Sequence, residues 1–176
     1  MAARTPLRTL PAAVAGLCAL AASALGGLPP RSQVPIAVPP LEKAIPVAAD
    51  AGWVDTGIDV GPGEELHFLA TGEVDLQRGN PGAVCGPGGI DLLTVDQPVP
   101  DANLGALIGK ISQLAAARVD EDSGMEVRDE IFVLFLIGQE RSVTVPFKGR
   151  LYLGVNENVL KDNGGVYSVV VIRRPA

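Results

Sequence analysis

Residues 151–172 read LYLGVNENVLKDNGGVYSVVVI, and the order of residues in this stretch decides the fold. At both of its ends apolar residues alternate with polar or small ones, the period-two pattern of half-buried β-strands. The segment between them, NENVLKDNGG at 156–165, is rich in side-chain oxygens and holds the Asn-Gly dipeptide favoured in tight hairpin turns. The stretch therefore predicts two antiparallel strands joined by a polar loop.

The same alternation recurs along the chain upstream. It predicts further strands at 44–50, 53–60, 65–71, 106–111, 131–137 and 141–146. The 21 glycines and 15 prolines suit many short turns better than a helical bundle. We expect an all-β fold, an antiparallel β-sandwich, in which residues 112–119 form the one helical segment. Residues 72–100 are expected to form a long loop, and the acidic residues 120–126 a solvated one.

Strand alternation also predicts which side chains face the interior of the sandwich. The expected core residues are Trp53, Phe68, Leu107, Ile111, Leu151, Leu153, Tyr167 and Val169. Tyr152 is out of phase with Leu151 and Leu153, so it should point away from the core.

The N-terminal forty residues read as processing and linker segments. Two arginines precede a short apolar run that ends in Ala-Ser-Ala, which predicts a secretory signal peptide over residues 1–24. A membrane anchor is the alternative, but the run is shorter than a bilayer requires. Five prolines in residues 25–40 predict a Pro-rich linker, so the β-sandwich domain should span 41–176. The expected protein is secreted or periplasmic, has no membrane span after processing and keeps a single cysteine, Cys85, as a buried apolar residue.

Charge and composition argue against several functions. A formal net charge of −6 disfavours nucleic-acid binding, which needs clustered basic side chains. The one histidine, His67, lies in an expected strand, and no Gly-x-Ser-x-Gly or Cys–His nucleophile pattern occurs. One histidine and one retained cysteine cannot build a zinc site of nitrogen and sulfur ligands. We therefore expect a protein that is not an enzyme.

The polar loop before the last strand has the composition of a calcium site. Calcium takes six to eight oxygen ligands from carboxylates, amides and backbone carbonyls. Glu157, Asp162 and Asn163 would supply these ligands if the loop folds back, with Asn156, Asn158 or backbone carbonyls adding to them. The alternative is an ordinary hairpin loop without metal.

The last two strands and their loop resemble the C-terminal half of the PA-I-like bacterial galactophilic lectins. The shared pattern is GRLYLGVNEN at 149–158 followed by DNGGVYSVVV at 162–171. Stretches 52–60, 70–74 and 105–111 agree in the same order. The resemblance implies a calcium-dependent, sugar-binding β-sandwich of the galactose-binding jelly-roll group.

Carried over position by position, the resemblance implies a partial site. Glu157 stands at the family's acidic position, and Asp162 and Asn163 stand at its paired amide positions. A family ligand that is a backbone carbonyl falls on Leu76. The family's sugar-contacting loop corresponds to residues 91–97, where Asp96 and Gln97 are the candidates but no histidine occurs.

Two functional hypotheses follow. In the first, the chain is an exported, non-catalytic, lectin-like domain that binds carbohydrate through one calcium ion, with Asp96, Gln97, Asn156 and Asn158 as sugar-contacting candidates. In the second, it is a structural or adhesion module of the cell envelope that binds neither sugar nor metal. Both leave homo-oligomerisation open.

Overall fold

The computed structural model describes residues 41–119 and 126–174. The strands, in chain order, are β1 (Leu41–Ala48), β2 (Val54–Val60), β3 (Glu65–Asp75), β4 (Val84–Cys85), β5 (Leu107–Val119), β6 (Glu126–Leu136), β7 (Glu140–Thr144), β8 (Gly149–Val155) and β9 (Gly164–Arg174). The predicted signal peptide, the Pro-rich linker and most of the acidic loop lie outside the described residues. No helix of the described part reaches the length and hydrophobicity that crossing a bilayer requires.

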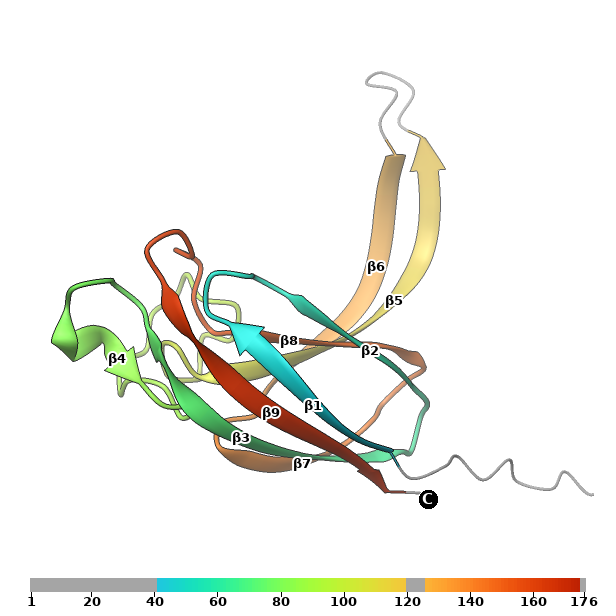
Figure 1. Cartoon of the computed structure of the whole chain (residues 1–176). Coiled ribbons are helices and arrows are strands. Elements are labelled where there is room, and N and C mark those ends of the chain that lie inside the picture. The colour runs from blue at the N-terminus through green and yellow to red at the C-terminus, as the bar shows by residue number, and fades with distance from the viewer. Residues whose placement is uncertain (1–40, 120–125, 175–176) are drawn as a thin grey trace, which may run out of the picture. The chain divides into compact units, whose positions relative to one another are not determined.

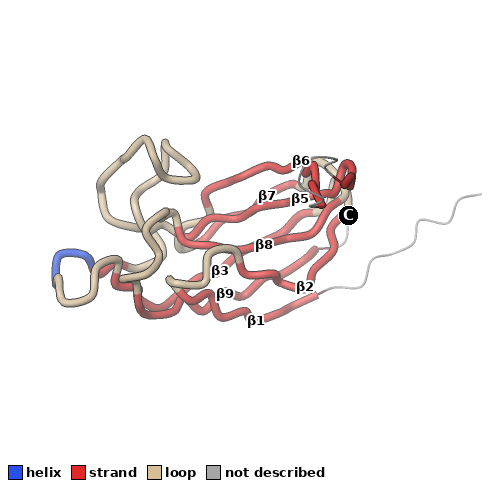
Figure 2. The backbone as a smooth tube through the Cα atoms, turned by 90° about the horizontal axis from the view of Figure 1, so that it is seen from above, coloured by secondary structure: helices blue, strands red, loops and turns tan. Residues whose placement is uncertain are grey.

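The strands form two antiparallel sheets, which confirms the predicted β-sandwich (Figure 1). The first sheet has the order β1-β9-β3-β4, with β7 also paired to β3. The second has the order β2-β8-β5-β6. Figure 2 shows that the long connections and the short helix η1 (Pro81–Ala83) gather at one end of the strands. That end carries the predicted site residues.

Alternate residues of both sheets fill one core, as the period-two pattern predicts. Of the expected core residues, those confirmed as buried are Phe68, Leu107, Ile111, Leu151, Leu153, Tyr167 and Val169. Tyr152 faces away from Leu151 and Leu153, as expected, because successive side chains of a strand point to opposite faces.

The prediction is wrong for Trp53, which is half-buried on the outer face of the second sheet. The inward residues of β2 are Thr56, Ile58 and Val60, so Trp53 is out of phase with them. Its ring instead lies 5.1 Å from the Lys110 ammonium, which also sits 4.8 Å from the ring of Tyr152. Cation–π attraction and the methylene stem of Lys110 hold the two rings there.

Two local predictions are also corrected. Residues 112–119 are not helical but continue β5, where they pair with β6 in a long hairpin. Helix propensity is a weak preference of the isolated segment, and cross-strand pairing overrides it. The segment 72–100 is only partly loop, because β3 runs on to Asp75 and pairs with β4.

Tyr167 connects the core of β9 to the loops at the site end. Its side chain is fully buried, and its hydroxyl lies 2.8 Å from the Gly86 carbonyl and 2.9 Å from the Gly105 carbonyl. The Cys85 thiol, buried and free as predicted, is 3.5 Å from the same hydroxyl. Burial raises the pKa of Tyr167 and that of Cys85 above their ordinary values.

These raised pKa values predict loss of stability at alkaline pH. Both groups hold their protons to a higher pH in the folded chain than in the unfolded chain, where the thiol and the phenol ionise near pH 9 and 10. The stabilisation is therefore complete below pH 9 and declines above it, by about 1.4 kcal/mol per pH unit for each group that ionises only on unfolding. Urea unfolding between pH 7 and 11 would measure the decline. Tyr167→Phe should make the decline less steep above pH 10, and an unchanged slope would contradict this reading.

Candidate functional site

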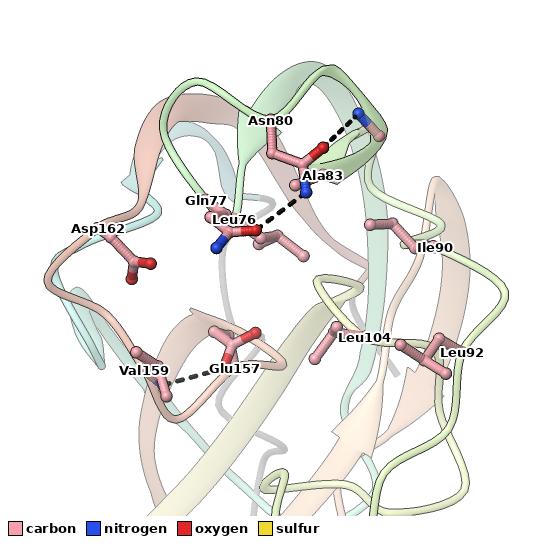
Figure 3. Close-up of a pocket in the computed structure, with 11 residues that line it drawn as sticks. Leu76, Gln77, Asn80, Ala83, Ile90, Leu92, Leu104, Glu157, Val159 and Asp162 are labelled. Carbon is pink, nitrogen blue, oxygen red and sulfur yellow. Dashed lines mark hydrogen bonds between the residues drawn. The ribbon is translucent and has the colours of Figure 1, made fainter.

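Three connections meet at the site end of the sandwich: residues 76–83, 86–106 and 156–163. They line a cavity of about 400 Å³ that is open to one side (Figure 3). One part of its wall is apolar and is built by Leu76, Ala83, Ile90, Leu92, Leu104 and Val159. The polar part comes from Gln77, Asn80, Glu157 and Asp162. Three of the four positions predicted to bind calcium therefore line one cavity, namely Leu76, Glu157 and Asp162.

Asp162 and the fourth predicted ligand, Asn163, carry side-chain oxygens that lack partners. Oδ1 of each residue is buried, and within the described chain neither accepts a hydrogen bond. Asn163 is fully buried and donates its amide hydrogen to the Ala49 carbonyl at 3.3 Å. Leaving a buried oxygen unpartnered costs about 1–3 kcal/mol, so two adjacent ones call for a cation or water.

Glu157 is held against its own loop. Its Oε1 accepts hydrogen bonds from the backbone amides of Asn158 and Val159, both at 2.9 Å. Figure 3 shows the bond to Val159. This arrangement fixes the carboxylate of Glu157, which lines the cavity, and Oε2 takes no part in either bond. Glu157 thus serves as a rigid acceptor.

Leu76 follows the end of β3 and is fixed by the chain on both sides. Its amide donates to the Ala83 carbonyl at 3.0 Å, and the Arg78 amide donates to the Asp162 carbonyl at 3.0 Å. The second of these bonds ties the connection after β3 to the loop before β9. The segment of Leu76, whose carbonyl is one of the predicted ligands, is therefore held beside Asp162.

A second hollow, of about 280 Å³, adjoins the first. Predicted sugar-contacting residues that line it are Asp96, Gln97 and Asn158, and it shares Glu157 and Val159 with the larger cavity. Gln97 is buried, and its Nε2 donates to the Ala102 carbonyl at 2.7 Å, whereas its Oε1 has no partner within the described chain. Tertiary structure therefore brings the 91–97 segment next to Glu157.

Asn156 has a different position from its predicted neighbours, because it is fully buried and lines neither hollow. Its Oδ1 accepts from the Val99 amide at 2.9 Å. Its Nδ2 approaches the carbonyls of Val99, Ala102 and Asn103 at 3.0, 3.3 and 3.1 Å. Both ends of the amide are engaged, so Asn156 holds the 99–103 loop in place and is not used in the functional proposal below.

Sequence reasoning missed the polar wall formed by Gln77 and Asn80. Asn80 donates to Gln77 Oε1 at 2.9 Å and accepts from the Gly82 amide at 3.1 Å, as the N-cap of η1 (Figure 3). The Asn-Pro-Gly turn at 80–82 was the available signal, because such a turn fixes an asparagine side chain against its own backbone.

The described residues contain no cluster of three or more His, Cys, Asp or Glu side chains suited to a metal ion. A cation here would rest on two carboxylates, one amide oxygen and a backbone carbonyl. Such an all-oxygen set suits calcium rather than a transition metal.

His67 lies on the outer face of β3, opposite β7. Its Nδ1 is 3.0 Å from the Ser142 hydroxyl, and its Nε2 is 3.5 Å from the exposed Glu140 carboxylate. None of these three residues lines either of the two hollows described above. The group pairs side chains across neighbouring strands, as expected for a strand histidine.

Together these features define an antiparallel β-sandwich with a loop-built candidate site at one end. Among solved structures, the chain is similar to the N-terminal domain of EclA, described as a PllA-like lectin, with 21% identity and a TM-score of 0.50. The match covers 74% of this chain and 95% of that one, and at this identity it establishes a shared fold. A second structure, the virus-like particle of giant freshwater prawn Macrobrachium rosenbergii extra small virus, covers 90% of this chain and 94% of that one at 13% identity, but its TM-score of 0.19 carries no argument. No family model and no curated protein matches the sequence.

Proposed function

We propose that this chain is an exported, non-catalytic carbohydrate-binding domain that uses one calcium ion. Asp162, Asn163 and Glu157, together with the Leu76 carbonyl, would hold the ion. When bound, calcium would supply open coordination positions for the hydroxyl oxygens of a sugar. Asp96 and Asn158, which line the adjoining hollow, would orient that sugar.

The observation that carries the proposal is the pair of buried, unpartnered oxygens on Asp162 and Asn163. A divalent cation would satisfy both at once and would offset their desolvation. Glu157 and Leu76 line the same cavity as Asp162, which agrees with one shared ion.

Carbohydrate is the proposed ligand for two reasons. The fold is shared with a lectin domain, and the cavity combines carboxylates and amides with an apolar wall. A sugar ring presents hydroxyl edges and an apolar face, so it matches such a surface. The arginines and short apolar run within residues 1–24 support the proposal that the chain acts outside the cytoplasm.

Calcium is expected to stabilise the wild-type chain, and Asp162→Ala should remove that gain. At a calcium concentration a hundred times the dissociation constant, the gain is about 2.7 kcal/mol. Without calcium, Asp162→Ala should cost little or even stabilise, because it removes an unpartnered buried oxygen. Thermal melts in chelator and in calcium would give both values.

Asp91→Ala is the matched control, since Asp91 is an exposed carboxylate at the same end that lines neither hollow. It should keep the full calcium response. Titration with galactosides and other monosaccharides, with and without calcium, then tests the ligand. A wild-type melting curve that calcium does not move would refute the metal site, and calcium binding without any sugar response would refute the lectin-like function.

One observation favours the second candidate function, a structural or adhesion module without sugar or metal. Asn156 and Gln97, two of the predicted sugar contacts, are buried and bonded within the loops. Under that alternative, neither calcium nor sugars would change the melting temperature.

A further inference from the structure

The outermost strand of the second sheet, β6, presents an apolar edge without a partner in the described chain. It pairs with β5 on one side only, at the end of the order β2-β8-β5-β6. From residue 131 to its end at residue 136 it reads IFVLFL, with no charge and no proline. Ile131 is 57% exposed and Phe132 54% exposed. Such an edge is a template for pairing with another strand.

The other sheet edges are protected in the ways usual for monomeric sandwiches. β1 carries Pro46 and the charged pair Glu42 and Lys43. β2 contains Asp55 and Asp59, with an irregular register between them. β7 and β4 are short. Proline, charge, irregular register and shortness all discourage edge pairing, and β6 has none of them between Ile131 and Leu136.

The backbone of β6 shows which peptide groups are available. The Ile137 amide donates to the Leu107 carbonyl at 2.9 Å. In an antiparallel pair such bonds recur at every second residue, so the peptide groups of Ile131, Val133 and Phe135 also point toward β5. The peptide groups of Glu130, Phe132, Leu134 and Leu136 therefore point away from the sheet. The Leu136 carbonyl confirms this direction, because it accepts a hydrogen bond from the Arg141 side chain at 2.9 Å.

We propose that β6 pairs antiparallel with β6 of a second copy of this chain, about a two-fold axis at Val133. In this register Phe132 lies opposite Leu134 of the second copy, and Ile131 lies opposite Phe135. Apolar residues then face apolar residues along the whole shared segment, and the outward peptide groups find partners. The two four-stranded sheets become one continuous sheet.

Charge at the two ends of the segment favours this register. Glu130 accepts a hydrogen bond from Ser112 at 2.8 Å and lies 3.9 Å from the Lys110 ammonium, both through Oε2. It would lie opposite Leu136 of the second copy, where the guanidinium of Arg141 is bound. Within the described residues, Arg141 has no carboxylate partner within 4.0 Å, although Asp101 lines the same hollow of about 270 Å³. If the two-fold centre moved by one residue, to Phe132, Arg128 would instead lie opposite Leu136 of the second copy. A second guanidinium, itself bound to Glu126, would then face Arg141 where the Val133 centre brings Glu130.

A second copy suits this edge better than the chain's own N-terminal arm. Residues 25–40 contain five prolines, which have no amide hydrogen to donate to a neighbouring strand. The edge also matches itself in both apolar pattern and charge, as a two-fold interface requires.

The purified full chain should therefore sediment as a dimer at micromolar concentration. Leu134→Pro and Phe132→Lys should each convert it to a monomer. The first removes an outward amide that β5 does not use, and the second places a charge on the apolar edge. Val166→Lys is the matched control, an exposed strand position on the other sheet, and should remain dimeric. Circular dichroism confirms that each variant keeps its strands.

Cross-linking tests the register directly. Val133→Cys would bring two cysteines opposite each other with Cα atoms about 4.5 Å apart, within disulfide range. In Ile131→Cys the two cysteines would lie four residues apart along the strands, about 13 Å, and should not cross-link. The native Cys85 is buried and does not compete. A monomeric wild type, a dimer that both edge variants leave intact, or cross-linking through Ile131→Cys in preference to Val133→Cys would each overturn the proposal.

Discussion

Replacement of Tyr167 by alanine is expected to lower the free energy of unfolding by about 3–5 kcal/mol. Tyr167 is the largest fully buried side chain of the described residues, so truncation leaves a cavity between the sheets. It also removes the hydroxyl beside the Gly86 and Gly105 carbonyls, which belong to two parts of the loop region above the core. Urea unfolding at neutral pH would measure the loss.

Tyr167→Phe separates the two contributions. The ring stays, so the remaining cost is that of the missing hydroxyl and the carbonyls left without a donor, about 1–3 kcal/mol. Tyr152→Phe is the matched control, because its ring lies on the outer face against Lys110 and its loss of a hydroxyl should change little. If the two phenylalanine variants were equally stable, Tyr167 would not connect the loops to the core.

Asn156→Ala should cost about 2–4 kcal/mol, because it removes an acceptor for the Val99 amide and a donor shared by three loop carbonyls. The loss should be the same in chelator and in calcium, since the side chain lines neither hollow. Chemical denaturation gives the cost. Hydrogen exchange at the Val99 amide shows whether the 99–103 loop has come loose.

Asn158→Ala provides the comparison. Asn158 is exposed and two residues away in the same loop, so its truncation should change stability by less than about 0.5 kcal/mol. The two asparagines have the same chemistry and differ in burial. An Asn156→Ala chain as stable as Asn158→Ala would mean that the loop does not depend on this amide.

Some residues of the candidate site could be predicted from the sequence and others could not. The oxygen-rich composition of residues 156–165 and the resemblance together named Glu157, Asp162 and Leu76, which line one cavity. They did not distinguish Asn156, which anchors a loop, from Asn158, which lines the second hollow. Two asparagines separated by one residue look alike in a loop, because nothing local determines which of them turns inward.

The sequence by itself determined the class of fold and the phase of most strands, since period-two alternation is a local property that burial on one face imposes. Tertiary structure alone decided the rest. Residues 112–119 form a strand because they pair with β6. Trp53 faces outward because the inward residues of β2 are Thr56, Ile58 and Val60, and residue 53 does not belong to this alternation. The meeting of Leu76 with Asp162, and of the 91–97 segment with Glu157, depends on which loops the two sheets bring to the same end. These are contacts between residues far apart in the chain, and no local pattern encodes them.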